Sequence, residues 1–124
     1  MDHKDTGNLL DHERLEVYQY ALTFTEDAYR LSRKLPRGKG QLGDQLERAS
    51  ESIVLRIAEA VAADRESADR RRHFRAALGS TYECAAVLKL AGFRGVSTEQ
   101  TREEVRNQVV RLAKMLGKLA GRKR

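Results

Sequence analysis

The chain has 124 residues, 40% of them hydrophobic and 34% charged, which fits one domain whose core needs no metal or disulfide. The only cysteine, Cys84, excludes an intramolecular disulfide, and no apolar run approaches the roughly 20 residues that span a membrane. The polar start of the chain lacks the basic and apolar stretches of a signal peptide. We therefore expect a soluble, cytoplasmic protein.

The formal net charge of +6 arises entirely at the C-terminal end. Residues 1–110 carry equal numbers of basic and acidic side chains, whereas residues 111–124 carry no acid. Such an end suits an anionic partner, because basic groups release counterions from phosphate backbones. The alternative is a solubilising helix end whose cations complement the negative pole of the helix dipole. The basic residues of this end are Arg111, Lys114, Lys118, Arg122, Lys123 and Arg124.

Residues 1–12 are predicted to form a flexible N-terminal arm, and the first helix is expected over residues 13–35. Apolar side chains recur there every three or four residues, which places them on one stripe of a helix. A second, partly separate apolar stripe runs beside it and is compatible with a second packing surface. Pro36 ends the helix, because proline disfavours helical backbone at the preceding residue and donates no hydrogen bond.

The second helix is expected over residues 41–64, where apolar residues repeat at spacings of four and three, as in the seam of a helix bundle. The third helix is expected over residues 66–91, with Gly92 as its left-handed C-terminal cap. Gly79 lies inside this helix, where glycine costs about 1 kcal/mol relative to alanine. We therefore expect a neighbouring helix to pack tightly against Gly79.

The fourth helix is expected to begin at a capping box formed by Ser97 and Gln100 and to end near Ala120. No segment alternates apolar and polar residues as a strand would, so no sheet is predicted. Short connections make successive helices antiparallel neighbours. The sequence therefore predicts an all-α, antiparallel up-down four-helix bundle over residues 13–121, followed by a basic tail, residues 122–124.

The sequence predicts no metal, no cofactor and no catalytic site. His3, His12 and His73 lie at no metal-ligand spacing, and the chain carries no P-loop, dinucleotide motif or nucleophile elbow. Cys84 and His73 are eleven residues apart on one predicted helix. This spacing separates them by about 16 Å, too far for a catalytic dyad. Cys84 is most simply a small core residue.

Two basic clusters are candidates for contacts with nucleic acid. Arginines at the start of a helix oppose its dipole, so local stability does not explain the second cluster, whereas guanidinium groups match phosphate oxygens. The alternative is a solvated face with pairs such as Glu66–Arg70. Surface aromatics are scarce, so binding should depend on charge and shape. The first cluster comprises Arg30, Arg33, Lys34, Arg37 and Lys39, and the second comprises Arg65, Arg70, Arg71, Arg72 and Arg75.

Five polar residues are embedded in otherwise apolar helices: Ser52, Arg56, Glu59, Ser80 and Glu83. Arg56 shares a helix face with Glu59, and Ser80 shares one with Glu83. A catalytic interpretation pairs Glu59 with Glu83 as acid and base. The structural interpretation is a satisfied polar network between helices or subunits, which fixes their register. We predict the structural network.

Four segments of the chain resemble a known family. Residues 52–60, Ser-Ile-Val-Leu-Arg-Ile-Ala-Glu-Ala, resemble its pattern of Ser-Ile, two variable residues and Asn-Ile-Ala-Glu-Gly. Residues 74–83 resemble its alanine-leucine-glycine-serine stretch ending in glutamate, and residues 15–18 and 35–36 match its opening helix. This is the four-helix bundle family encoded by intervening sequences in bacterial 23S ribosomal RNA. It is related to the accessory protein of diversity-generating retroelements.

The resemblance implies a bundle that assembles into a five-subunit ring and has a role with RNA or DNA. Through the retroelement relatives it implies a basic surface that binds nucleic acid and a reverse transcriptase. Arg56 and Ala60 replace the family's asparagine and glycine, so no role of that asparagine carries over. Our hypothesis is a non-enzymatic, homo-oligomeric bundle that binds nucleic acid. The alternative is a scaffold that docks a partner such as a reverse transcriptase without touching nucleic acid.

Overall fold

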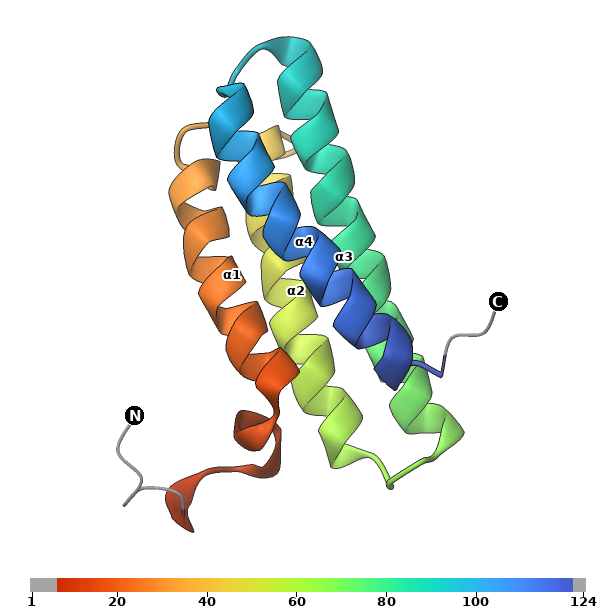
Figure 1. The fold of residues 1–124 in the computed structure, drawn as a ribbon. Coiled ribbons are helices and arrows are strands. Elements are labelled where there is room, and N and C mark those ends of the chain that lie inside the picture. Colours follow the sequence, from red (N-terminus) through yellow and green to blue (C-terminus); the bar gives the residue numbers. More distant parts are fainter. Residues whose placement is uncertain (1–6, 122–124) are drawn as a thin grey trace.

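The computed structural model describes residues 7–121, which form four long helices in up-down order (Figure 1). The helices are α1 (Glu16–Ser32), α2 (Leu42–Ala62), α3 (Ala68–Arg94) and α4 (Glu99–Leu119), and a short 3-10 helix, η2 (Asp11–Arg14), precedes them. The part of the chain described contains no strand, and the predicted all-α bundle is confirmed. Residues 1–6 of the predicted arm and all of the predicted tail, residues 122–124, lie outside the described residues.

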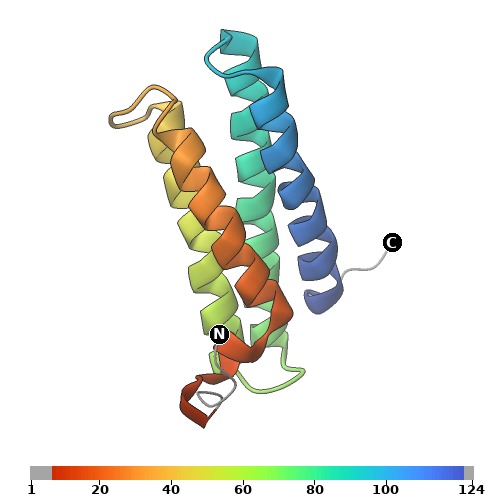
Figure 2. The same cartoon turned by 60° about the vertical axis from the view of Figure 1, so that its left-hand side comes forward.

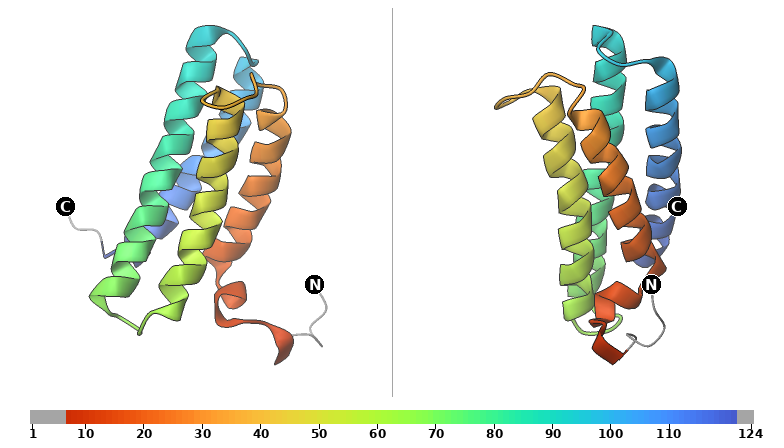
Figure 3. Two further views of the ribbon diagram at one scale, coloured as in Figure 1. Left: turned by 180° about the vertical axis from the view of Figure 1, so that it is seen from behind. Right: turned by 90° about the vertical axis from the view of Figure 1, so that its left-hand side faces the viewer.

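The four helices form a square in which each packs on its neighbours in sequence and α1 packs on α4 (Figure 2, Figure 3). Within residues 7–121, α1 makes no such contact with α3, so these two helices are diagonal. None of the described helices is both long and apolar enough to cross a membrane.

The core is built from the predicted stripes, because spacings of three and four bring apolar side chains to one face of each helix. Phe24 of α1, Ile53 and Ile57 of α2, Phe74 of α3 and Leu112 of α4 are each at most 1% exposed. Burying a side chain of this size contributes roughly 1.5–3 kcal/mol. The core therefore draws on all four helices.

Cys84 of α3 lies in this core, as predicted, and is fully buried. Burial raises the pKa of its thiol to about 12, because the surroundings cannot solvate a thiolate. Glu83 beside it raises this pKa further. Cys84 is therefore a neutral packing residue.

The C-terminal cap of α3 differs from the prediction. The helix continues through Gly92 to Arg94, and Gly95 adopts the left-handed conformation with φ 67° and ψ 27°. A Cβ on Gly92 would lie 3.1 Å from Nε of Arg102, so the glycine at this position admits the Arg102 side chain. The prediction of Gly92 as the cap is wrong, because Gly92 keeps helical backbone and the left-handed residue is Gly95, three positions later.

The start of α4 also differs from the predicted capping box of Ser97 and Gln100. Thr98 is the N-cap, and its Oγ1 accepts a hydrogen bond of 3.2 Å from the backbone N–H of Thr101. The Ser97 hydroxyl instead accepts a hydrogen bond of 3.1 Å from Arg102, which reaches over from the first turn of α4. Because Arg102 binds the Ser97 hydroxyl, the cap falls one residue later.

Tight backbone packing occurs at Gly43, whereas the prediction placed it at Gly79. Gly79 is exposed, and a Cβ added there would have nothing within 4 Å. A Cβ on Gly43 would lie 2.6 Å from the carbonyl oxygen of Ser32 and 2.9 Å from that of Pro36. The N–H of Gly43 also donates to the Pro36 carbonyl at 2.9 Å. The first turn of α2 is therefore pressed against the chain that leaves α1.

Candidate nucleic-acid interface

The second basic cluster and the C-terminal basic residues meet at one end of the bundle. The antiparallel order places the start of α3 beside the end of α4 (Figure 1). Arg75 donates a hydrogen bond of 3.1 Å to the carbonyl of Ala120, and Cδ of Arg71 lies 2.9 Å from where a Cβ on Gly121 would be. Lys118 is exposed in the last turn of α4. We call Arg71, Arg75 and Lys118 the basic corner.

Backbone carbonyls hold both arginines of the basic corner in place. Arg71 Nη1 donates to the Glu66 carbonyl at 2.9 Å, and Arg75 binds a carbonyl at the end of α4. A cation at this place complements the negative pole of the α4 dipole. The arginine at position 75 therefore stabilises a neighbouring helix, which reasoning about α3 alone did not anticipate. Because a guanidinium group has about five N–H donors, each arginine keeps donors for a further ligand.

Arg70 and Arg72 of the second cluster lie on α3 and have other partners. The Arg70 guanidinium lies 5.7 Å from the centroid of the Phe74 ring, a cation–π contact. Arg72 forms an ion pair with Asp69. Arg70 also lines a cavity of about 580 Å³ between η2 and the turn that joins α2 to α3. The other charged residues that line this cavity are Asp11, Arg14, Asp64 and Arg65.

The turn between α2 and α3 presents Arg65 to solvent through a strained backbone. The N–H of Ser67 donates to the Asp64 carbonyl at 3.2 Å, and Glu66 adopts a φ of 57°. A left-handed conformation costs a residue other than glycine roughly 1–2 kcal/mol. The Ser67 hydroxyl then caps α3 by accepting a hydrogen bond of 3.0 Å from the N–H of Arg70. The fold thus keeps Arg65 exposed beside the start of α3.

The first basic cluster lies at the opposite end of the bundle, around the connection from α1 to α2 (Figure 1). Arg37 forms ion pairs with Asp44 at 3.6 Å and Glu47 at 3.1 Å. Arg30 pairs with Asp27. Arg33, Lys34 and Lys39 are exposed. The fold therefore separates the first cluster from the second and places two carboxylates of α2 within ion-pair distance of Arg37.

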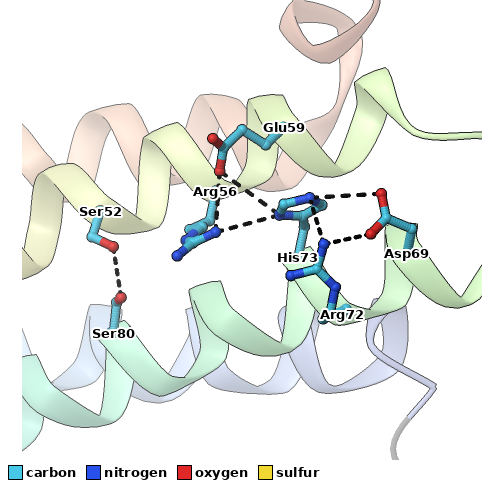
Figure 4. A network of polar contacts seen from close by, with 7 residues as sticks. All are labelled: Ser52, Arg56, Glu59, Asp69, Arg72, His73 and Ser80. Atoms are coloured by element: carbon cyan, nitrogen blue, oxygen red, sulfur yellow. Dashed lines mark hydrogen bonds and ion pairs between the residues drawn. The ribbon is translucent and has the colours of Figure 1, made fainter.

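The predicted polar network lies between α2 and α3 (Figure 4), and its members differ in part from those predicted from the sequence. The Ser80 hydroxyl donates to that of Ser52 at 2.9 Å, which joins the two helices. Arg56 Nη1 lies 3.4 Å from Oε1 of Glu59 and 3.5 Å from Nδ1 of His73. His73 Nδ1 is 3.7 Å from Oε1 of the same glutamate. Arg56 and Glu59, which were predicted to share a helix face, are thus in contact, whereas Ser80 bonds to Ser52 of α2 and not to Glu83.

His73 is a member of this network that the sequence analysis missed. Its Nε2 lies 3.8 Å from Oδ2 of Asp69, and its side chain is only 15% exposed. A hydrogen bond from Arg72 lowers the pKa of the Asp69 carboxyl. Asp69 and His73 are four residues apart on one helix, a spacing that brings side chains together and was visible in the sequence.

Glu83 does not join the network. It is exposed on α3, and among residues 7–121 no hydrogen bond or ion pair links it to Glu59. No group of three histidine, cysteine or acidic side chains within the described chain is arranged to hold a metal ion. The Ser52–Ser80 hydrogen bond, which joins α2 to α3, can fix the register of the two helices.

The sequence model of the 23S rRNA-intervening sequence proteins matches residues 13–118. The chain belongs to this family. Among solved structures, a protein with unknown function from the S23 ribosomal protein family of Bacteroides thetaiotaomicron aligns with a TM-score of 0.75. The alignment covers 84% of this chain and 97% of that chain at 24% sequence identity, which supports the fold. The comparison with curated proteins gave no match.

Two of the four segments that resemble the 23S rRNA-intervening sequence proteins pack on each other. Residues 52–60 lie on α2 and residues 74–83 on α3, and the Ser52–Ser80 hydrogen bond joins them. Ala60 is fully buried, and α2 continues past it to Ala62. These two segments thus contribute to the interface between α2 and α3.

Proposed function

We propose that this 23S rRNA-intervening sequence protein is a non-enzymatic, homo-oligomeric bundle that binds RNA or other nucleic acid through the basic corner. The observation that supports this most is the convergence of Arg71, Arg75 and Lys118 beside Gly121. The chain continues from there into Arg122, Lys123 and Arg124. Within the described residues, the fold brings Arg71 and Arg75 of α3 to the end of α4, where Lys118 lies.

The chemistry of the basic corner suits phosphate groups. Both arginines are oriented by backbone carbonyls, so little side-chain entropy is lost when their remaining N–H groups meet phosphate oxygens. Neither arginine of the corner forms an ion pair with a carboxylate within residues 7–121. The basic corner therefore offers uncompensated positive charge to a polyanion.

The first basic cluster offers less net charge. Arg37 already faces two carboxylates, and Arg30 faces one. Arg33 and Lys34 stay exposed and supply a second, weaker contact with nucleic acid at the opposite end. Assembly of several copies would multiply such contacts on one nucleic acid and raise the apparent affinity.

Binding of a fluorescent RNA hairpin, measured by anisotropy at several salt concentrations, tests the proposal. The corner variant carries Arg71→Gln, Arg75→Gln and Lys118→Gln, and the control variant carries Arg33→Gln, Lys34→Gln and Lys39→Gln. Each removes three positive charges, so both have the same net charge. The corner variant should bind more weakly, and its log–log salt slope should be shallower by about 2 to 3, because each phosphate contact contributes about 0.9.

Equal losses in the two variants would reject the basic corner as the principal site. No binding by the wild-type chain in dilute salt would reject nucleic-acid binding itself and favour the scaffold alternative. Circular dichroism of each variant, compared with wild type, checks that the loss of the Arg75–Ala120 hydrogen bond has left the helices folded.

A further inference from the structure

A pocket between α3 and α4 lies at the end of the bundle opposite the basic corner (Figure 1). Its volume is about 350 Å³, which suits one small ligand and is too small for a nucleic-acid duplex. Ala85 and Leu88 supply apolar wall, and Phe93 lines the pocket although it is 78% exposed. The ring of Phe93 is therefore available to a ligand. We call this site the α3–α4 pocket.

One wall of the α3–α4 pocket is an arginine that the structure holds in place. Nη1 of Arg102 donates to the Ser97 carbonyl at 2.6 Å and to the Ser97 hydroxyl at 3.1 Å. A Cβ on Gly92 would lie 3.1 Å from Nε and 3.2 Å from Cζ of Arg102, so glycine at this position lets the guanidinium lie against α3. Because the bonds to Ser97 use only Nη1, the guanidinium keeps N–H donors for a ligand.

Four further charged side chains line the α3–α4 pocket without neutralising one another. Lys89 and Arg106 are cations, and both are exposed. Glu99 and Glu103 are carboxylates and are exposed as well. Within residues 7–121, no ion pair involves any of these four side chains. The pocket therefore offers both hydrogen-bond donors and hydrogen-bond acceptors that carry full charge.

An aromatic ring, cations and carboxylates in one pocket match the three parts of a nucleotide. Aromatic rings stack on bases, and lysine and arginine bind phosphate oxygens. A carboxylate has two acceptor oxygens, so it pairs best with a base edge that presents two neighbouring donors. Guanine has such an edge, because its N1–H lies beside its N2 amino group. Adenine and cytosine instead place an acceptor beside their amino group, and uracil places carbonyls on both sides of its N–H.

We propose that the α3–α4 pocket binds an unpaired guanine nucleotide whose base stacks on Phe93. The carboxylates of Glu99 and Glu103 accept hydrogen bonds from the donor edge of the base. Lys89 and Arg106 bind the phosphate group. Watson–Crick pairing would occupy the donor edge, so the ligand is a free nucleotide or a guanosine in single-stranded RNA. This site goes beyond the proposed function, because it recognises one base, whereas the basic corner meets the phosphates of a backbone.

Titration of isotope-labelled protein with guanosine monophosphate (GMP), followed by two-dimensional NMR, tests the proposal. Amide signals of residues 88–106 should shift, and GMP should bind about tenfold more tightly than adenosine monophosphate (AMP). Phe93→Leu removes the stacking ring but keeps an apolar side chain, and it should weaken GMP binding at least about fivefold. Tyr82→Leu is the matched control and should leave GMP binding unchanged. Tyr82 is a 47% exposed aromatic residue of the same helix that does not line the pocket.

A variant with Glu99→Gln and Glu103→Gln tests recognition of the base apart from charge. A glutamine amide presents one acceptor and one donor, which suits adenine better than guanine. The preference for GMP over AMP should therefore disappear, although the loss of two negative charges strengthens binding of both phosphates. A pentauridine with one central guanosine distinguishes the two sources of the ligand. Tighter binding of this RNA than of GMP assigns the pocket to single-stranded RNA, and equal or weaker binding assigns it to the free nucleotide.

Equal affinities for GMP, AMP and inorganic phosphate would overturn the inference, because charge alone would then explain binding. Unchanged GMP binding in Phe93→Leu would overturn it too, as would a wild-type chain that binds neither GMP nor the guanosine-containing RNA. The corner variant should keep GMP binding, and Phe93→Leu should keep the salt-dependent binding of duplex RNA. Duplex binding without GMP binding contradicts only the pocket, whereas GMP binding without duplex binding contradicts only the basic corner.

Discussion

The same substitution at two glycines should have opposite effects on stability. In Gly43→Ala, the new methyl group would lie 2.6 Å and 2.9 Å from two backbone carbonyl oxygens, which cannot move as a flexible side chain can. Overpacking of this kind costs roughly 1–3 kcal/mol. Displacing α2 would also weaken the hydrogen bond from Gly43 to Pro36, a loss of about 1 kcal/mol. Alanine is favoured over glycine inside a helix by up to about 1 kcal/mol, which offsets part of these costs. The net destabilisation is therefore about 2 kcal/mol.

In Gly79→Ala, the methyl group meets open space, so only the propensity gain of about 0.5–1 kcal/mol remains. The Tm of a domain of this size shifts by roughly 4 °C for each kcal/mol of change in stability. We therefore expect Gly43→Ala to lower Tm by about 8 °C and Gly79→Ala to raise it by about 2–4 °C. Both are compared with wild type by thermal circular dichroism. A stabilising Gly43→Ala, or a destabilising Gly79→Ala, would refute the reasoning.

Three further changes probe individual contacts. Ser67→Ala removes the hydroxyl that caps α3 and should cost about 1 kcal/mol in urea unfolding. The hydrogen bond to Glu51 and burial raise the pKa of Tyr29 from 10.0 to about 12. That stabilisation is complete below pH 10.0 and lost as the pH rises to about 12, so wild type should lose stability over this range relative to Tyr29→Phe. Arg72→Gln should raise the pKa of Asp69 in an NMR titration, because the carboxyl loses its hydrogen bond from the guanidinium.

Each of these three predictions would be contradicted by a specific result. An unchanged urea midpoint in Ser67→Ala would show that solvent replaces the cap. Parallel alkaline stability curves for wild type and Tyr29→Phe would show that the hydroxyl is not bound to Glu51. An unchanged pKa of Asp69 in Arg72→Gln would assign its lowering to His73 instead.

The four helices could be predicted from the sequence because their signals are local. Apolar spacing repeats within each segment, and Pro36 and the glycine-rich connections interrupt it. Helix ends were less predictable. Gly92 and Gly95 are both acceptable caps for α3, and local sequence does not choose between them; the helix passes Gly92, which packs against Arg102 of α4, and is capped by Gly95.

The candidate site depended more on contacts between distant residues. The charge excess near the C-terminus and the arginines of α3 were visible in the sequence, but their convergence follows from the antiparallel order that places Arg75 at Ala120. The ion pairs of Arg37 with Asp44 and Glu47 likewise need the chain to turn back on itself. Local spacing cannot show such pairs.

The salt dependence of RNA binding by the wild-type chain tests the central claim most directly. The basic corner and the adjoining tail, residues 122–124, together hold six cations. If all of them contact phosphates, the log–log slope with a duplex RNA should be about −5, and affinity should fall about 10³-fold over a fourfold rise in salt. Binding that does not change with salt, or no binding in dilute salt, would contradict the account.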